Sequence, residues 1–422
     1  MTSERLFGVI GSGTMGGGIA QAAAAAGFIV HTLDTNPDLV KSAYSKIAER
    51  LDTRVAKGSL PRHERDNIMS RLHVARDYDA FKECEVVIEA VSEDLALKRK
   101  IIGQLDSVAS PRTLLGTNTS SLPISKLSEG LKHSDRFLGM HFFNPAPVMK
   151  LIELVRGEKT SEQAMVDARA ISTALDKTAV KVKDSPGFIG NRVNRPFYLE
   201  ALRLLETGEA NIRSIDTAMK TVGGFRMGPF ELLDLIGLDI NFRVTETVYE
   251  GFGKPSRFAP SAIQQKLVAE GRLGRKSGCG FYDYSNGEPT VAYETKPKDC
   301  TSWKASESLK QFAEMLEKPA DRNMWIYSRI FMAVMNEAAM TADSVALARD
   351  VNLTMELGFN YPEGPLATAD YVGLDICQRL LADYHRDTNG DERYAPNPLM
   401  DRHVAKGELG EKTAHGFLYH AL

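Results

Sequence analysis

A chain of 422 residues has material for two to four domains, and 43% hydrophobic with 25% charged residues is typical of a soluble globular protein. The 52 basic and 55 acidic side chains leave a net charge of −3, so neither nucleic acid nor a membrane is an expected partner. The four cysteines lack the spacing of a metal site, a redox pair or a disulfide framework, and a strand-like run begins almost at once. We therefore expect a cytoplasmic protein without a bound metal.

Strand-like and helical runs alternate from residue 4 to about 184. Helices are expected between the strands, for example at Thr14–Ala26 and Leu95–Val108. This alternation predicts an α/β Rossmann-type domain over residues 1–184, with a mainly parallel sheet that is covered on both faces. The predicted strands are Leu6–Ile10, Phe28–Leu33, Val86–Glu89, Thr113–Thr117, Phe137–His141 and Lys150–Val155.

A glycine-rich segment, GSGTMG at residues 11–16, follows the first predicted strand and opens the first predicted helix. Gly11 permits the tight turn, Gly13 lets the backbone approach a pyrophosphate, and Gly16 lets helix and strand pack closely. The alternative is a glycine turn that binds nothing. We predict a dinucleotide site that includes Gly11, Gly13, Thr14, Met15 and Gly16.

Asp34 lies 21 positions after Gly13, at the end of the second predicted strand. Its carboxylate can accept hydrogen bonds from the adenosine ribose and repels a 2′-phosphate. Thr35 and Asn36 supply no arginine for such a phosphate, so NAD is the predicted cofactor. The alternative is that Asp34 only caps a turn.

The segment HFFNP begins at His141, at the end of an apolar strand. Ligands bind at the carboxyl ends of strands in such sheets. A histidine there can take a proton from an alcohol while hydride leaves the adjacent carbon. Glu153 lies 12 residues later among apolar neighbours, where it needs a partner, and it can orient the imidazole. The alternatives are a structural histidine and a glutamate on a solvated strand face.

The pattern becomes helical after Ser185-Pro186-Gly187, with helices expected at about 188–206, 212–222, 229–250 and 259–270. We predict a first helical domain over residues 185–285. The following stretch is rich in Pro, Gly, Lys and Thr, which predicts a linker over residues 286–305.

An internal repeat follows the linker. Gly228-Pro229-Phe230 matches Gly364-Pro365-Leu366, and further pairs from Gly237-Leu238-Asp239 to Gly280-Phe281 share the same offset of 136 residues. Arg192 pairs with Arg329 and Glu200 with Glu337 at an offset of 137. A second helical domain over residues 306–422 is therefore predicted as a duplicate of the first.

These motifs resemble the 3-hydroxyacyl-CoA dehydrogenase family over about residues 5–284. The match includes residues 11–16, 118–121, 141–151, 185–192, 227–234 and 278–282. The resemblance implies a Rossmann-type NAD domain followed by two repeated all-α 6-phosphogluconate-dehydrogenase-like domains. It also implies oxidation of an L-3-hydroxyacyl-CoA to a 3-oxoacyl-CoA, in β-oxidation-like catabolism of fatty or aromatic acids.

The resemblance assigns roles to matching residues. His141 is implied as the acid/base and Glu153 as its partner, while Ser120 and Asn191 complete the polar pocket around the substrate oxygen. Coenzyme A contacts are implied at Arg50, Lys57 and Ser120. Arg50 and Lys57 share one face of the helix after Asp34 with Lys46 and Arg54, and the alternative is that this face is an ordinary solvated surface. Further NAD contacts are implied at Glu93, Lys98, Ser120, Asn144 and Lys276.

The second helical copy distinguishes this chain from compact family members. Ser328 stands where the first copy has Asn191, and the second copy lacks a cofactor domain, so one active site per chain is expected. Two-domain relatives dimerise through their helical domains. We expect the second copy to take the partner's place in an internal pseudo-dimer, and the sequence leaves open a homodimer of whole chains.

Two other functions are weighed. A hydroxy-acid or phosphogluconate-type dehydrogenase would use a lysine on the first long helix, where this chain has Asn191, Arg192, Asn194 and Arg195. A non-enzymatic, crystallin-like relative would tolerate the loss of His141 or Glu153, which are both present. The acyl length cannot be read from the sequence, and 3-hydroxybutyryl-CoA and 3-hydroxyadipyl-CoA both fit.

Overall fold

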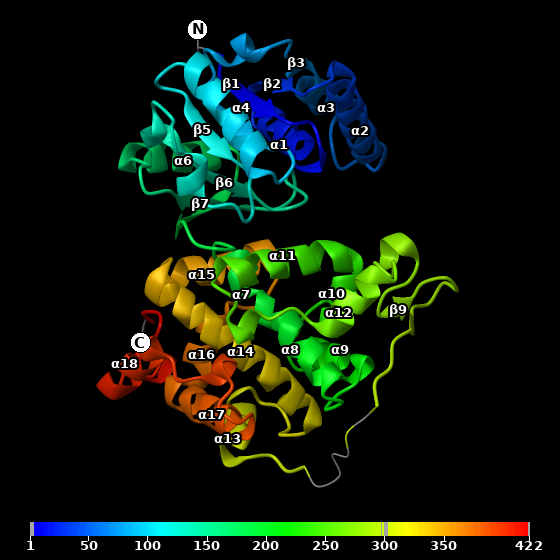
Figure 1. Ribbon diagram of the computed structural model, residues 1–422, viewed down its shortest axis with the longest axis vertical. Coiled ribbons are helices and arrows are strands. Elements are labelled where there is room, and N and C mark those ends of the chain that lie inside the picture. The colour runs from blue at the N-terminus through cyan, green and yellow to red at the C-terminus, as the bar shows by residue number, and fades with distance from the viewer. Residues whose placement is uncertain (1–3, 297, 299–302, 421–422) are drawn as a thin grey trace. The chain divides into compact units, whose positions relative to one another are not determined.

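The computed structural model describes residues 4–296, 298 and 303–420. The chain forms two compact units, Met1–Phe188 and Ile189–Leu422 (Figure 1). Parts of the predicted domains lie outside the described residues, namely residues 1–3 and 421–422. The same holds for residues 297 and 299–302 of the predicted linker.

The first unit contains an eight-stranded sheet in the order β3-β2-β1-β4-β5-β6-β7-β8. All neighbouring strands are parallel except β6 and β7, which are antiparallel, so the prediction of a mainly parallel sheet is confirmed. The strands are β1 Leu6–Ile10, β2 Ile29–Leu33, β3 Leu72–Val74, β4 Val86–Glu89, β5 Leu114–Thr117, β6 Phe137–Phe142, β7 Leu151–Arg156 and β8 Thr178–Lys183. Strands β3 and β8 were not among the predicted strands.

Helices cover both faces of this sheet (Figure 1). An apolar core joins α1, α2 and α6 to alternate strand residues such as Leu138, Met140 and Phe142 of β6. Because strand side chains alternate between faces, His141 points to the opposite face, on which α4 packs. The helices are α1 Thr14–Ala25, α2 Pro37–Ala56, α3 Arg62–Ser70, α4 Leu95–Val108, α5 Ile124–Leu127 and α6 Glu162–Ala174.

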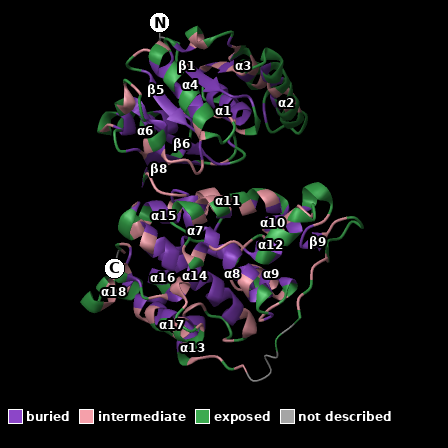
Figure 2. Cartoon of the chain, in the orientation of Figure 1, coloured by how far each residue is buried: buried purple, intermediate pink, exposed green. Residues whose placement is uncertain are grey.

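The second unit is helical, and its central helices are mostly buried (Figure 2). Its first half holds α7 Gly190–Val193, α8 Arg195–Glu206, α9 Ile212–Thr221, α10 Pro229–Ile236, α11 Leu238–Gly251 and α12 Ala262–Ala269. Its second half holds α13 Glu307–Met315, α14 Arg322–Ser344, α15 Ala348–Phe359, α16 Pro365–Val372, α17 Leu374–Asp387 and α18 Pro398–Lys406.

Two details differ from the expected helical pattern. The helix expected over 229–250 is divided into α10 and α11 at Gly237, whose φ of +100° favours glycine and does not continue a helix. Part of the predicted linker is ordered, because β10 Thr290–Val291 pairs antiparallel with β9 Tyr282–Asp283.

The duplicated sequence has duplicated local structure. Asp234 at α10 accepts hydrogen bonds from the backbone N–H groups of residues 281 and 282, and Asp370 at α16 accepts them from residues 417 and 418. Gly237 and Gly373 both have a positive φ at the start of the following helix. The matching contacts show that each copy closes on itself in the same way.

The two copies also pack against each other, with α14 beside α8 and α9. Arg192 Nε of the first copy lies 2.5 Å from Glu337 Oε1 of the second. In the reciprocal pair, Arg329 Nη2 of the second copy lies 2.9 Å from Glu200 Oε1 of the first. Each glutamate receives one more arginine across the same boundary, Arg257 on Glu337 and Arg393 on Glu200. Equivalent residues therefore make equivalent contacts in both directions.

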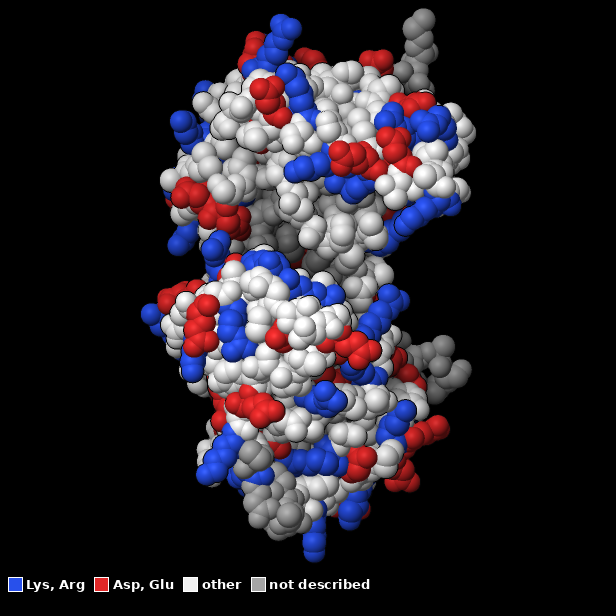
Figure 3. Space-filling model, turned by 90° about the vertical axis from the view of Figure 1, so that its right-hand side faces the viewer, with Lys and Arg blue, Asp and Glu red and all other residues white. Residues whose placement is uncertain are grey.

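The surface carries both signs of charge. Lysine and arginine side chains are interspersed with aspartate and glutamate over the face that Figure 3 shows. Among the described residues, the search for a helix long and apolar enough to cross a bilayer found none.

Candidate active site

Polar side chains gather where three neighbouring strands end. Strands β4, β5 and β6 are parallel, so Glu89, Thr117 and His141 all lie near one edge of the sheet. All three belong to the sheet face on which α4 packs, and all three are buried. This is the edge at which ligands bind in doubly wound sheets.

His141 and Glu153 face each other across the only antiparallel strand pair of the described sheet. They are directly opposite in the β6–β7 register, and His141 Nδ1 lies 2.7 Å from Glu153 Oε2. Glu153 is fully buried, so its carboxylate needs this partner. With Nδ1–H donating to the carboxylate, Nε2 carries the lone pair and can accept a proton. Phe143 and Phe188 pack beside the ring, at centroid distances of 4.8 and 5.9 Å.

A second buried network lies beside this pair. Lys98 of α4 donates to Glu89 Oε1 at 2.8 Å and to the Val91 carbonyl at 3.2 Å, and its Nζ lies 3.3 Å from Glu93 Oε2. Thr117 donates to the other oxygen of Glu89 at 2.6 Å. Glu89 ends the apolar strand β4, but no role was predicted for it.

Glu93 holds the loop that contains Ser120. Its Oε1 accepts hydrogen bonds from the Ser120 backbone N–H at 3.2 Å, from the Ser121 hydroxyl at 2.9 Å, and from the Thr119 hydroxyl. The predicted residues Glu93, Lys98 and Ser120 thus lie in one connected group. Asn118, which the sequence analysis also left without a role, accepts the Phe142 N–H at 2.9 Å and fixes the strand end after His141.

The glycine turn has the geometry of a phosphate-binding loop. Gly11 has a φ of +96°, and a Cβ at Gly16 would stand 1.9 Å from the Gly11 carbonyl oxygen, so larger residues are excluded at both positions. A Cβ at Gly13 would meet nothing within 4 Å, which leaves the space that a pyrophosphate needs. Gly13 precedes α1 without a capping side chain, so the first N–H groups of the helix can bind an anion.

Asp34 stands beside this turn at the end of β2. Its Oδ2 accepts hydrogen bonds from the backbone N–H and the hydroxyl of Ser12, both at 2.7 Å, and Thr35 donates to Oδ1. Burial opposes ionisation, but the hydrogen bonds from Ser12 and Thr35 outweigh it and lower the pKa of Asp34. An ionised carboxylate beside the glycine turn fits a ribose diol and disfavours a 2′-phosphate.

Comparison with known proteins gives the family. Residues 7–185 match the family model described as 3-hydroxyacyl-CoA dehydrogenase, NAD binding domain. Residues 187–284 and 325–420 match the model of the C-terminal domain of the same enzymes. The chain belongs to the 3-hydroxyacyl-CoA dehydrogenase family. It is therefore an NAD-dependent oxidoreductase that acts on the hydroxyl carbon of 3-hydroxyacyl-CoA thioesters.

Relatives cover both the whole chain and its first two-thirds. The 3-hydroxyadipyl-CoA dehydrogenase of Escherichia coli (strain K12) is 35% identical, over 95% of this chain and 97% of that protein. A probable 3-hydroxybutyryl-CoA dehydrogenase of Bacillus subtilis (strain 168) is 40% identical, over 65% of this chain and 96% of that protein. The crystal structure of an E. coli K12 3-hydroxybutyryl-CoA dehydrogenase superposes with a TM-score of 0.85 at 34% identity, over 96% of this chain and 99% of that one.

Two residues to which the family resemblance gives roles lie in the second unit of this dehydrogenase. Asn191 belongs to α7, and Lys276 Nζ contacts both oxygens of Asp239, at 2.5 and 2.7 Å. The second copy repeats the latter pair as Lys412 on Asp375. The pair recurs in the second copy, which has no cofactor domain. The Lys276–Asp239 pair therefore belongs to the helical fold itself, whatever else Lys276 contacts.

The basic face of α2 is exposed. Arg50, Arg54 and Lys57 all reach solvent, while the opposite face of the helix is anchored in the core through residues such as Ile47 and Leu51. Arg50 donates to Gln21 at 2.9 Å, which ties it to α1. Asn144 is also exposed and lies two residues after the end of β6, at the same sheet edge as His141.

Proposed function

We propose that this dehydrogenase uses His141 as its acid/base. The proton of the substrate 3-hydroxyl passes to Nε2 of His141 as the C3–H bond breaks, and a C=O double bond forms in the 3-oxoacyl-CoA product. Bound NAD supplies the hydride acceptor. The observation that carries this proposal is the buried His141–Glu153 hydrogen bond of 2.7 Å. An ionised carboxylate stabilises the imidazolium that forms when the ring takes the proton.

The remaining residues hold the reactants. We propose that the glycine turn and Asp34 bind the adenosine diphosphate part of NAD, and that the hydroxyl of Ser120 and the amide of Asn191 bind the substrate oxygen. Asn144 and Lys276 are proposed as further cofactor contacts. Lys98 is proposed to act through Glu93, because its three N–H groups already face Glu89, Val91 and Glu93.

Coenzyme A is proposed to bind on the exposed basic face of α2. Arg50 and Lys57 provide positive charge for its phosphates. Such local charge is needed because the net charge of the chain is −3, so the chain as a whole does not attract anions. Ser120 is proposed to contact the thioester end of the same ligand.

The second helical copy is proposed to be an internal partner for the first, so that one chain contains a pseudo-dimer and one active site. The reciprocal pairs Arg192–Glu337 and Arg329–Glu200 support this, because a two-fold interface makes each contact twice. The domain limits proposed from the sequence are 1–184, 185–285 and 306–422. A cytoplasmic location is also proposed, which the buried thiols of Cys84 and Cys377 support.

The decisive experiment is an NADH-forming assay with L-3-hydroxyacyl-CoA thioesters of graded length, including 3-hydroxyadipyl-CoA with its terminal carboxylate. We expect turnover with at least one thioester and none with free hydroxy acids, because the α2 face binds the coenzyme. Turnover of a free hydroxy acid such as phosphogluconate in preference to every thioester would replace this proposal by a hydroxy-acid dehydrogenase.

A further inference from the structure

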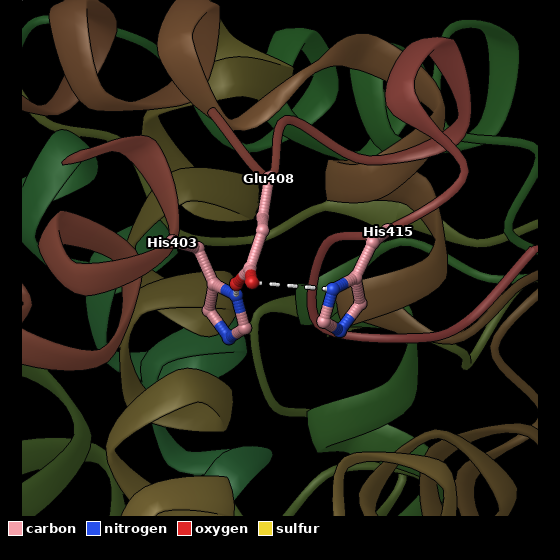
Figure 4. Close-up of side chains that lie close together, drawn as sticks. All are labelled: His403, Glu408 and His415. Carbon is pink, nitrogen blue, oxygen red and sulfur yellow. Dashed lines mark hydrogen bonds and ion pairs between the residues drawn. The ribbon is translucent and has the colours of Figure 1, made fainter. Parts of the chain in front are cut away.

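Two histidines and a glutamate meet near the carboxyl end of the second copy, far along the chain from the residues of the proposed reaction. His403 is in the last turn of α18, Glu408 follows that helix, and His415 follows the short 3₁₀ turn Glu411–Thr413. Figure 4 shows both imidazoles turned toward the one carboxylate. His403 Nδ1 lies 2.7 Å from Glu408 Oε2, and His415 Nδ1 lies 3.3 Å from Glu408 Oε1.

The spacing suits a transition-metal ion. The three ligand atoms lie within 4.8 Å of one another. Tetrahedral zinc with bonds of about 2.0–2.1 Å needs ligand atoms roughly 3.3 Å apart, so small side-chain rotations suffice. All three side chains are partly shielded, with 17–28% of their surface exposed, which leaves room for a water as fourth ligand.

The first copy is an internal control for this cluster. At the offset of 136 residues, His403, Glu408 and His415 correspond to Leu267, Arg272 and Cys279. The backbone frame is the same, because the bridge Gly274–Cys279 recurs as Gly410–His415. The fold therefore closes without a His-Glu-His set, and only the second copy has the three ligand side chains together.

The exchanges also reverse the local chemistry. Leu267 is fully buried, and Arg272 donates to the Gly280 and Ala292 carbonyls, so the first copy places an apolar group and a cation where the second has an imidazole and a carboxylate.

Both imidazole rings pack against aromatic neighbours. His415 stacks on Tyr419 with centroids 4.1 Å apart and planes 11° apart, and His403 packs edge-on against Phe417.

We propose that His403, Glu408 and His415 form a binding site for one Zn²⁺, or for another transition-metal ion of similar ligand preference. Imidazole and carboxylate ligands with one open position are typical of such ions. The ion would join the end of α18 to the segment that follows the turn, and so would brace the last part of the second copy. It takes no part in the dehydrogenase reaction.

The test uses the full chain without a polyhistidine tag, after treatment with EDTA. Titration with ZnCl₂, followed by calorimetry and elemental analysis of the desalted protein, is expected to give one Zn²⁺ per chain. A rise in Tm with ZnCl₂ is expected too, because an ion that binds the folded state stabilises it.

Two variants locate the site. His403→Leu restores the residue type of the first copy, and Glu408→Gln keeps the shape of the side chain. Each is expected to weaken Zn²⁺ binding at least about tenfold and to remove the Tm rise, while NADH formation stays unchanged. The matched control, His385→Ala in α17, is expected to bind Zn²⁺ like the original chain. Failure to bind one Zn²⁺, or equal binding by both variants and the original, would overturn the proposal without touching the dehydrogenase activity.

Discussion

The His141–Glu153 hydrogen bond is positioned by the backbone. Both residues lie inside strands, directly opposite each other, and neither depends on a loop for its place. Because β6 and β7 are antiparallel, residues 12 positions apart in the sequence become neighbours on one face of the sheet. The sheet itself therefore holds the backbone of both residues in register.

Replacement of the imidazole tests its role directly. His141→Ala is expected to lower kcat by about 10²–10⁴ fold, the usual contribution of a positioned acid/base, and to leave NAD binding nearly unchanged. Steady-state NADH formation and NAD titration by fluorescence measure the two effects. His133→Ala, in the same unit, is the control and should keep full activity. Near-normal turnover of His141→Ala would require a different base.

A contact of a single residue can be predicted from the sequence where that residue clearly requires a charged or hydrogen-bonding partner. Glu153 has apolar neighbours and requires a partner, and the structure supplies His141. The sequence could not reveal that Lys98 is buried against Glu89, because the two residues meet only when α4 packs on β4. Nor could it show that Asn118 holds the backbone after His141.

At the scale of elements, one buried acid joins α9 to α10. Asp216 of α9 accepts hydrogen bonds from the Phe230 and Glu231 N–H groups at the start of α10, and from the Tyr282 hydroxyl. Burial is the largest effect on this carboxyl, and it raises the pKa of Asp216 to about 7. The second copy has Asn352 at the equivalent position, and its amide oxygen accepts the Leu366 N–H in the same way.

The raised pKa makes stability depend on pH. A carboxyl with a folded-state pKa near 7 and an ordinary unfolded value near 4 binds its proton more tightly when folded, so its contribution to stability falls as pH rises from about 4 to 7. Asp216→Asn removes this loss and has a precedent in the second copy. We expect the difference in the free energy of unfolding, Asp216→Asn minus the original chain, to increase as pH rises from 5 to 8, by an amount on the order of a few kcal/mol.

Chemical denaturation at pH 5, 6, 7 and 8 measures this trend. Asn352→Asp is the reciprocal variant, and it should introduce the same kind of pH dependence into the second copy. A difference between Asp216→Asn and the original chain that does not change with pH would show that the carboxyl has the same proton affinity in both states.

Helices and strands with a strong apolar pattern could be predicted from the sequence, and those with a weak apolar pattern could not. The bounds predicted for β1, β4 and α4 agree with the structure. Strand β3 has three residues, and β8 alternates buried and exposed residues with two lysines, so neither has the apolar run that marks a central strand. The break at Gly237 was missed because the helical apolar pattern continues on both sides of it.

At the scale of the whole molecule, two buried charge clusters hold the helical copies together. Glu337 lies between Arg192 and Arg257, and Glu200 between Arg329 and Arg393. Removing one member of a buried ion pair leaves an uncompensated charge, which costs about 3–5 kcal/mol. The repeat in the sequence predicted equivalent residues, but it could not predict that they pair across the boundary between the copies.

Glu337→Gln and Glu200→Gln are each expected to lower the free energy of unfolding by about 3–5 kcal/mol, since each leaves one buried arginine, Arg192 or Arg329, without its carboxylate. Urea denaturation measures both. Glu307→Gln, which breaks the exposed pair with Lys310, serves as control and should cost less than about 1 kcal/mol. If only one of the two variants loses stability, the clusters are not equivalent in energy despite their equivalent geometry.

Fusion of the two helical copies into one chain has a consequence for how they can change. In a dimer of identical subunits, a mutation changes both symmetry-related sites at once, so both sites must tolerate it. Here each copy is encoded separately, so Asn352 can replace an aspartate and His403 a leucine on one side alone. The second copy can thereby change its residues independently of the first.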